Sequence, residues 1–247
     1  MKAPFCRQGN KYPLRNEILH LIPEHKTFVE LFTGSGAIFF LKQKAEINIL
    51  NDLDTNTIRG LKLVKNAPLS KIKPQYPKLD TVERITKFYI ANQKTKDPIE
   101  KILIEKIRTC SGFSGKPVTN NKIYKHSSPT LVLDALPFYK EKLKGVELTN
   151  EDYETIIREY DSKKTFFFVD PPYENSSEAF GYAENKDFDF DRLKKALTKM
   201  KGDFLMTIND SPRIRKLFKP FFMLPVEIPN VWTHDVRKEL IITNYRI

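Results

Sequence analysis

The chain has 247 residues and a formal net charge of +11, from 42 lysines and arginines against 31 aspartates and glutamates. A chain of this length is long enough for one large α/β domain, or for one domain that carries a sizeable insertion. The positive surplus suits a polyanionic partner, nucleic acid first, although a basic surface without such a partner is also common.

Neither a membrane segment nor a metal centre is indicated by the sequence. No long apolar run occurs, and the N-terminus lacks the apolar core of a signal peptide, so we expect a soluble, intracellular protein of the cytoplasm. Cys6 and Cys110 have no metal-ligand spacing with each other or with the histidines. This arrangement argues against both a disulfide framework and a structural zinc.

A turn followed by a short helix is predicted near the N-terminus. Gly9 and Asn10 tolerate a positive φ, which favours a turn at these residues. Apolar residues then recur at helical spacing, at Leu14, Ile18, Leu21 and Ile22. Pro23 ends this helix because proline cannot continue its hydrogen bonding.

The next predicted elements are a strand over residues 28–32, which carries Glu30, and a glycine turn into a helix. Gly34, Ser35 and Gly36 form this turn, where glycine lets the backbone approach a ligand and the helix start offers unpaired N–H groups. A second strand over residues 47–50 is followed by Asp52. A glycine turn with an acid roughly 20 residues further on is typical of a nucleoside bound at a Rossmann-type sheet, the acid holding the ribose hydroxyls.

Two other nucleotide ligands are disfavoured by the same stretch. It has no P-loop lysine, which argues against a triphosphate, and Phe39 stands where a dinucleotide motif would have its third glycine. A second interpretation of Asp52 stays open, in which it caps a helix or forms an Asx turn within residues 51–54.

The composition changes over residues 61–144. Prolines break the chain between lysines, and residues 82–108 then have a helical pattern with one break near Pro98. A polar, basic loop follows over residues 109–128, with two glycines, Phe113 and Tyr124. Loops that mix lysines, amides and isolated aromatics suit contact with phosphates and base edges, and an ordinary surface loop is the alternative.

The chain returns to the sheet at residues 145–153, where Val146 and Leu148 alternate with polar residues. Asp152 and Tyr153 follow this strand. Asp152 is also well placed to be an acid at the first turn of a helix over residues 153–160, where the helix dipole favours negative charge.

A strand buried on both faces is predicted at residues 165–169, because five β-prone residues run into two prolines, which cannot donate to a sheet. Asp170 therefore sits at the carboxyl end of a buried strand, the edge where ligands bind in open α/β sheets. The Asp170 carboxylate, the Pro171 carbonyl and the Tyr173 ring form a pocket that suits a flat base with an amino group. The alternative is a strand end closed by a turn, with Tyr173 merely packing.

The remaining stretch continues the alternation of strands and helices. A polar loop over residues 174–191 holds four aromatics and has the character of a lid or stacking wall. A helix over residues 192–201, a strand over 204–208 that ends in Asn209, and a strand at 226–228 follow. A loop over 231–238 then leads into a final strand that begins at Glu239.

The motif Asp170-Pro171-Pro172-Tyr173 at a strand end resembles the catalytic motif of the Dam-like (class alpha) DNA adenine-N6 methyltransferases, which use S-adenosylmethionine. Five other stretches are similar to further motifs of that family. The first is the turn and helix over 9–23, in which Asn10 stands in place of a second glycine. The others are the glycine turn together with Asp52, the pair Asp152-Tyr153, the strand that ends at Asn209, and residues 239–245. The resemblance covers almost the whole chain and is weakest in the middle.

The resemblance implies a role for each matching position. The catalytic residues would be Asp170, Pro171, Pro172 and Tyr173. Residues near the cofactor would be Arg7, Gly9, Lys11, Glu30, Leu31, Phe32, Gly34, Ser35, Gly36, Asp52, Asp152, Tyr153 and Asp170. Within this set, Asp152 and Tyr153 would recognise the adenine of the cofactor. Candidate DNA contacts are Tyr173, Phe113, Lys116, Asn120, Asn121, Lys122 and Lys125.

The sequence thus predicts a Rossmann-like, doubly wound α/β methyltransferase sheet with a mainly helical DNA-recognition insertion. Residues 1–68 and 145–247 would form the catalytic domain that binds S-adenosylmethionine, and residues 69–144 the target-recognition insertion. The expected reaction is site-specific methylation of the exocyclic N6 amine of a flipped-out adenine in double-stranded DNA. In this reaction Asp170 and the Pro171 carbonyl would accept the two amine hydrogens.

Other targets and partners are also compatible with the sequence. Cytosine N4 or an RNA adenine would present a similar amine, and a catalytically silent DNA-binding protein could use the same fold. The intact Asp170, Gly34, Gly36 and Asp52 speak against the silent protein. We expect a monomer or weak dimer without a bound metal, and a cognate restriction endonuclease as one possible partner.

Overall fold

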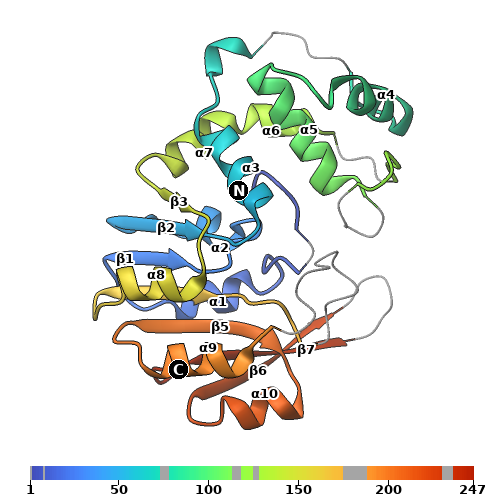
Figure 1. The fold of residues 1–247 in the computed structure, drawn as a ribbon. Coiled ribbons are helices and arrows are strands. Elements are labelled where there is room, and N and C mark those ends of the chain that lie inside the picture. The colour runs from blue at the N-terminus through green and yellow to red at the C-terminus, as the bar shows by residue number, and fades with distance from the viewer. Residues whose placement is uncertain are drawn as a thin grey trace.

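A computed structural model describes residues 2–7, 9–72, 78–112, 118–124, 128–174, 188–229 and 236–247. Within these residues one sheet has seven strands in the order β3-β2-β1-β4-β5-β7-β6 (Figure 1). The strands are β1 (Thr27–Glu30), β2 (Ile47–Asn51), β3 (Glu147–Thr149), β4 (Thr165–Val169), β5 (Asp203–Asn209), β6 (Phe222–Pro229) and β7 (Val236–Thr243). β1 to β5 are mutually parallel, and β7 pairs antiparallel with β5 and β6.

The order of the parallel strands confirms the doubly wound fold, because the chain starts at the centre with β1 and builds outward in both directions. β4 lies between β1 and β5 and is buried along its whole length. Its aromatic, β-prone sequence therefore occupies the central position that the sequence pattern predicts for it. Asp170 follows directly at the carboxyl end of this strand.

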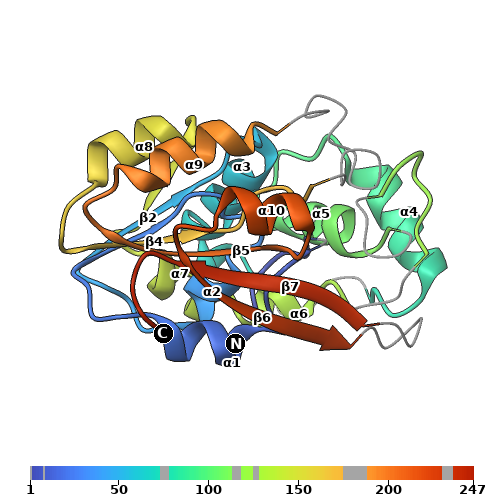
Figure 2. The same ribbon diagram turned by 90° about the horizontal axis from the view of Figure 1, so that it is seen from below.

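Helices cover both faces of the sheet, and the side chains of each strand alternate between two cores. On one face, α1 (Arg15–Leu21) and α2 (Ala37–Leu41) pack with Phe28, Phe166 and Phe168. On the other face, α8 (Tyr153–Tyr160), α9 (Phe190–Thr198) and α10 (Pro212–Leu217) pack with Val29 and Phe167. Figure 2 shows α8 and α9 on one side of the sheet and α1 on the other.

The described part of residues 69–144 is helical. It contains η1 (Leu69–Lys71), α4 (Val82–Asn92), α5 (Pro98–Cys110), α6 (Leu131–Asp134) and α7 (Leu136–Leu143). α4 and α5 enclose a small separate core, which includes Ile85, Tyr89 and Ile107. α5 also contributes Ile99 and Leu103 to the main core, and α3 (Thr55–Lys65) contributes Leu61 to that core. The helical region is therefore anchored to the sheet domain through α5, beside α3.

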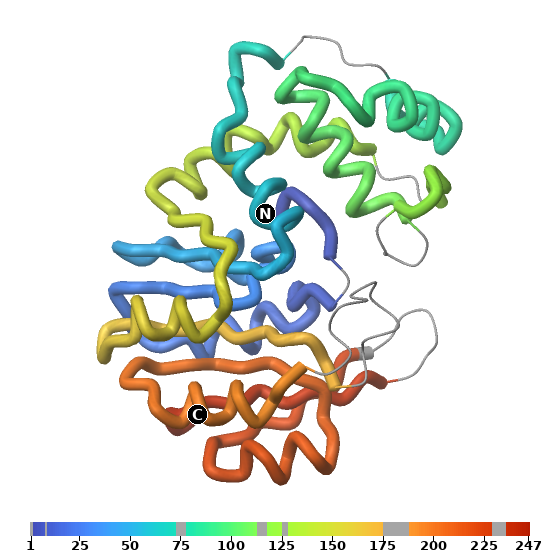
Figure 3. The backbone as a smooth tube through the Cα atoms, viewed as in Figure 1, coloured from blue at the N-terminus to red at the C-terminus, as the bar shows by residue number. Residues whose placement is uncertain are grey.

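Two predictions from the sequence are corrected by the structure. β7 begins at Val236, so the predicted loop over 231–238 ends earlier than its polar composition indicated, because pairing with β6 extends the strand. Cys6 and Cys110 form a disulfide, with their Cα atoms 5.0 Å apart, although their spacing argued against a disulfide framework. The fold brings these distant residues together, since the N-terminal segment runs beside α5 (Figure 3), where Lys106 Nζ donates to Pro4 O.

No helix in the described ranges is both long enough and apolar enough to cross a membrane.

Candidate active site

The polar residues singled out in the sequence meet at the carboxyl edge of the parallel strands. β1, β2 and β4 are aligned in register, with Glu30 opposite both Leu50 and Phe168. Parallel strands end at the same edge of a sheet, so the glycine turn after β1, Asp52 after β2 and Asp170 after β4 lie together there. This edge is the candidate active site.

The glycine turn has the backbone conformation that its sequence requires. Gly34 and Gly36 have φ values of 52° and 70°, in the left-handed region that other residues rarely adopt. A Cβ atom at Gly36 would lie 3.2 Å from the Phe40 ring. The turn leads into α2, as predicted, and Ser35 between the two glycines is buried.

Asp52, which follows β2, connects the end of this strand to the glycine turn through hydrogen bonds. Its Oδ2 accepts a hydrogen bond from Gly34 N at 2.7 Å, and its Oδ1 accepts one from Asp54 N at 2.9 Å. The second bond is the Asx turn that the sequence left open, whereas the N-cap of α3 is Asp54. Burial raises the pKa of Asp52, and the Gly34 N–H and the Arg7 charge oppose that rise.

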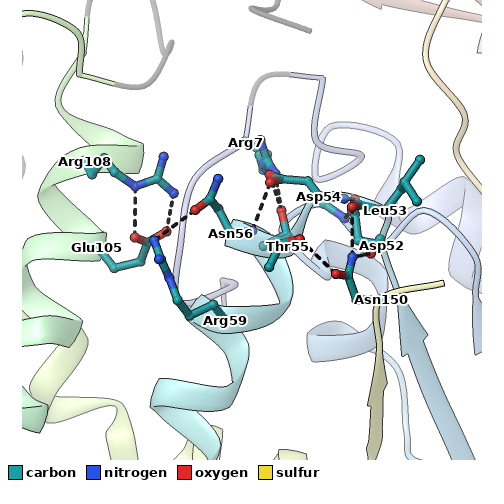
Figure 4. Close-up of polar contacts among 12 residues, drawn as sticks. Arg7, Asp52, Leu53, Asp54, Thr55, Asn56, Arg59, Glu105, Arg108 and Asn150 are labelled. Atoms are coloured by element: carbon teal, nitrogen blue, oxygen red, sulfur yellow. Dashed lines mark hydrogen bonds and ion pairs between the residues drawn. The ribbon is translucent and has the colours of Figure 1, made fainter. Parts of the chain in front are cut away.

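Arg7 and Asn150 contact the segment around Asp52, Arg7 through Asp54 and Asn150 through the backbone (Figure 4). The Arg7 guanidinium pairs with Asp54 and with the Thr57 hydroxyl at the start of α3. Asn150 Nδ2 donates to Asp52 O at 2.7 Å and to Leu53 O at 2.8 Å, so the segment after β3 holds the segment after β2. Sequence reasoning missed Asn150, whose only signal was a position just past a short strand.

Glu30 ends β1 beneath the glycine turn and is 1% exposed. Its Oε2 has no hydrogen-bond partner within the described parts of the chain. Burial raises the pKa of Glu30 well above its usual value, and the negative charges of Asp170 and Asp52 act in the same direction. Burial therefore disfavours the charged form of Glu30, and one of its polar atoms is left for a ligand. The neighbouring Leu31 points into the apolar core instead.

Asp170 is held by two donors on a single carboxylate oxygen. Lys11 Nζ lies 2.7 Å from its Oδ1, and the Thr207 hydroxyl of β5 donates to the same atom at 3.0 Å. Burial raises the pKa of Asp170, while the Lys11 charge and hydrogen bond oppose this rise. Lys11 itself is 2% exposed. Among the described residues both hydrogen bonds fall on Oδ1, so Oδ2 remains for a substrate hydrogen.

Lys11 belongs to the turn before α1, where the φ of Gly9 is 78°. Its ammonium donates to Gly9 O at 2.8 Å and lies 4.8 Å from the centroid of the Tyr173 ring. The resemblance placed Lys11 among the cofactor contacts, and the structure brings its ammonium to the Asp170-Pro171-Pro172-Tyr173 motif. Sequence reasoning did not find this contact, because the two residues lie far apart in the chain.

Asp152 caps α8 and binds an arginine. Its Oδ1 accepts a hydrogen bond from Glu154 N at 2.9 Å, so it serves the start of the helix. Arg192 of α9 donates to both carboxylate oxygens of Asp152, at 3.0 and 2.7 Å. Tyr153 lies in an aromatic cluster, with its ring centroid 5.5 Å from that of Phe32 and 6.1 Å from that of Phe188. This cluster lies beside the strand end of β1.

Of the candidate DNA contacts, Tyr173 lies at this edge, and the others belong to the stretch that follows α5. Asn120 and Asn121 have φ values of 50° and 57°, both in the left-handed region, and both side chains are exposed. Asn121 Oδ1 accepts a hydrogen bond from Gln93 Nε2 at 2.6 Å, and Lys122 is exposed. Phe113, Lys116 and Lys125 lie outside the described residues.

Comparison with known proteins agrees with this geometry. The family model described as D12 class N6 adenine-specific DNA methyltransferase matches residues 8–234. The chain is 26% identical to the type II methyltransferase M.MjaIII of Methanocaldococcus jannaschii, over 98% of this chain and 99% of that protein. It is 25% identical to the DNA N-6-adenine-methyltransferase of Escherichia phage P1, over 88% of this chain and 31% of that protein.

Among solved structures, a candidate methyltransferase from Escherichia coli, yhhF, is similar at 12% identity with a TM-score of 0.43. That match covers 100% of this chain and 92% of the other. The strand order and the buried central strand establish the fold class independently of it.

Proposed function

The chain belongs to the D12 class N6 adenine-specific DNA methyltransferase family, and we propose that it transfers a methyl group from S-adenosylmethionine to the N6 amine of an adenine flipped out of duplex DNA. The observation that carries this proposal is the arrangement of Asp170. Lys11 and Thr207 fix one oxygen of this carboxylate at the edge that also holds the glycine turn and Asp52.

The residues at the edge fit S-adenosylmethionine. Gly34 and Gly36 allow close approach of the backbone, and Glu30 keeps a buried oxygen without a described partner. Asp52 would hold the ribose hydroxyls, and the Phe32 and Tyr153 rings supply apolar surface for an adenine. When bound, S-adenosylmethionine supplies an electrophilic methyl group.

Asp170 prepares the amine for attack. The lone pair of an exocyclic amine is delocalised into the ring, which makes the nitrogen a poor nucleophile. By accepting one amine hydrogen on Oδ2, with the Pro171 carbonyl accepting the other, Asp170 favours the pyramidal form and orients its lone pair. Asp170 need not be a strong base, because the proton can leave after the methyl group has arrived.

Lys11 has a defined task in this scheme. A buried carboxylate tends to bind a proton, and a protonated Asp170 would be a poorer acceptor for the amine. The Lys11 ammonium at 2.7 Å opposes that protonation and also restricts the rotation of the side chain. The ring of Tyr173 would stack on the flipped base, since an amine inside the duplex cannot reach this pocket.

We further propose that residues 69–144 form the target-recognition insertion and that residues 1–68 and 145–247 form the catalytic domain. The exposed Asn120, Asn121 and Lys122 are well suited to base edges and phosphates.

The test is to incubate the protein with labelled S-adenosylmethionine and either DNA or RNA, and then to analyse the nucleosides. We expect N6-methyladenine in the DNA and no label in the RNA. N4-methylcytosine, or label in RNA adenine, would contradict the proposed target. Failure to bind S-adenosylmethionine in calorimetry, together with no transfer, would indicate a silent DNA-binding protein.

A further inference from the structure

A buried amide at the end of β2 has no part in the mechanism described so far. Asn51 is the last residue of β2 and is 1% exposed. β2 lies between β1 and β3 in the sheet, so Asn51 stands between the ends of two other strands. Because a buried polar side chain lowers stability unless it forms hydrogen bonds, the partners of this amide show which segments it holds together.

The Asn51 side chain uses both of its N–H donors and both acceptor positions of its oxygen. Its Nδ2 donates to Leu31 O, just past β1, and to Glu151 O, just past β3, both at 3.0 Å. Its Oδ1 accepts from the Thr149 hydroxyl at 2.9 Å and from Glu151 N at 3.0 Å. The orientation of the amide is defined, since the Glu151 N–H can only donate. One side chain thus joins the ends of three adjacent strands.

The two outer segments that Asn51 joins carry the rings of the proposed adenine site. Phe32 follows Leu31 directly, and Tyr153 comes two residues after Glu151. The centroids of the Phe32 and Tyr153 rings lie 5.5 Å apart. Since β2 separates β1 from β3 in the sheet, the distance between these rings depends on how the two strand ends are attached across β2. The hydrogen bonds of Asn51 supply that attachment.

We propose that Asn51 is a positioning residue for the adenine of S-adenosylmethionine, which sets the distance between the Phe32 and Tyr153 rings by joining the strand ends that carry them. A binding site needs its contacting side chains held to within about 0.5 Å, and supporting hydrogen bonds supply this precision. Asn51 acts through the two rings and not through a contact with the cofactor. The proposal rests on the proposed function, in which these rings supply apolar surface for that adenine.

The test is a calorimetric titration of S-adenosylmethionine and of adenosine into Asn51→Ala and into a matched control, Asn48→Ala. Asn48 is also a buried asparagine of β2, 2% exposed, but it lies near the opposite end of the strand. Its side chain forms two hydrogen bonds with the backbone of Ala45, at 2.8 and 3.1 Å. Both substitutions should therefore lower the melting temperature, whereas only Asn51→Ala should weaken ligand binding.

We expect Asn51→Ala to raise the dissociation constants of both ligands by about tenfold, since the adenosine group that they share meets the displaced rings. Asn48→Ala should change neither constant by more than about twofold. At saturating S-adenosylmethionine, kcat of Asn51→Ala for DNA methylation should stay within about twofold of wild type, so that the loss appears in KM. The reason is that Lys11 and Thr207, and not Asn51, hold Asp170.

A purely structural role predicts a different result. If Asn51 only stabilised the sheet, both variants would melt at lower temperature and both would bind the two ligands as wild type does. That outcome would overturn the proposal. Weaker binding of S-adenosylmethionine without weaker binding of adenosine would also overturn it, since the rings of the adenine site would then not be the cause.

Two further comparisons keep the result interpretable. If Asn51→Ala does not fold, adenosine is titrated into Asn51→Asp, which keeps both acceptor contacts but loses both N–H donors, and the same loss of affinity is expected. Adenosine is uncharged, so the new carboxylate does not attract it. A wild-type protein that binds no S-adenosylmethionine would overturn both the proposed function and this inference. Wild-type binding with unchanged constants in Asn51→Ala would overturn only the role of Asn51.

Discussion

Several charged groups at the carboxyl edge of the sheet are buried, whereas the polar groups of residues 118–124 in the helical region are exposed. Lys11, Glu30 and Glu239 are each at most 2% exposed, and Lys11 and Glu239 each meet an oppositely charged partner. Asn120 and Lys122, by contrast, face solvent. The charged side chains are therefore buried in one region and exposed to solvent in the other.

The difference follows from the task proposed for each region. Buried charges are expensive to separate, so a buried network holds its members in one geometry, which methyl transfer requires. Exposed side chains adapt their conformation to a partner with little loss of stability, which suits contact with a polyanion. Mutations at the edge should therefore change turnover or cofactor binding, and mutations in the helical region should change DNA affinity and its dependence on salt.

The largest effect is expected for Asp170→Ala, which should abolish methyl transfer and leave S-adenosylmethionine affinity nearly unchanged. The reason is that the proposed partner of Asp170 is the target amine. Single-turnover transfer and calorimetric binding measure the two properties separately. Asp203→Ala, at the opposite end of the neighbouring strand β5, is the control and should be active. Near-wild-type turnover in Asp170→Ala would show that the catalytic assignment is wrong.

Lys11→Met should be the next most damaging change, with a loss of about a hundredfold in kcat at pH 7. Burial raises the pKa of Asp170 and Lys11 opposes that rise, so the pKa should increase further once Lys11 is removed. Transfer requires the ionised carboxylate and is lost as pH falls through this pKa. The acid limb of the pH–rate profile should therefore move to higher pH, with partial recovery in alkaline buffer. An acid limb at the wild-type position would contradict the role of Lys11.

Asp52→Ala should weaken S-adenosylmethionine binding by about 1–3 kcal/mol, because a charged hydrogen-bond acceptor for the ribose is lost. Calorimetric titration measures this change. Since Asp52 also accepts from Gly34 N, part of the loss would come from a looser glycine turn. If the dissociation constant for S-adenosylmethionine did not change, the role of Asp52 would be limited to forming the Asx turn.

The smallest effect on turnover is expected from replacing Lys116, Lys122 and Lys125 together with alanine. If these lysines contact phosphates, the slope of log affinity for DNA against log salt should decrease by roughly one unit per lost contact. Cofactor affinity should stay the same. Changing Asn120 or Asn121 should instead relax sequence preference with little change in that slope. A wild-type slope in the triple variant would indicate that DNA is bound elsewhere.

Much of the sheet and of its active edge can be predicted from the sequence because the signals are local. The prolines after Val169 end a strand, and Gly34 and Gly36 mark a left-handed turn before a helix. An acid after β2 follows from the spacing to that turn. Each of these features depends on neighbouring residues, so a single sequence contains the information needed to find it.

The contacts that complete the site depend on distant segments and escaped prediction. Lys11 reaches Asp170 and Cys6 pairs with Cys110 only because the fold brings these residues together. Arg192 of α9 likewise donates a hydrogen bond to Asp152, which caps α8. Buried polar pairing of this kind has no periodicity, and residue type alone does not reveal which partner will be nearby.

The most direct test of the central claim is a crystal structure of the protein with a DNA duplex and a non-reactive analogue of S-adenosylmethionine. We predict a target adenine outside the base stack, with its N6 within hydrogen-bond distance of Asp170 Oδ2 and its ring on Tyr173. Lys11 would remain on the other carboxylate oxygen. A target base that stays stacked in the duplex, or an amine bound away from Asp170, would contradict the account.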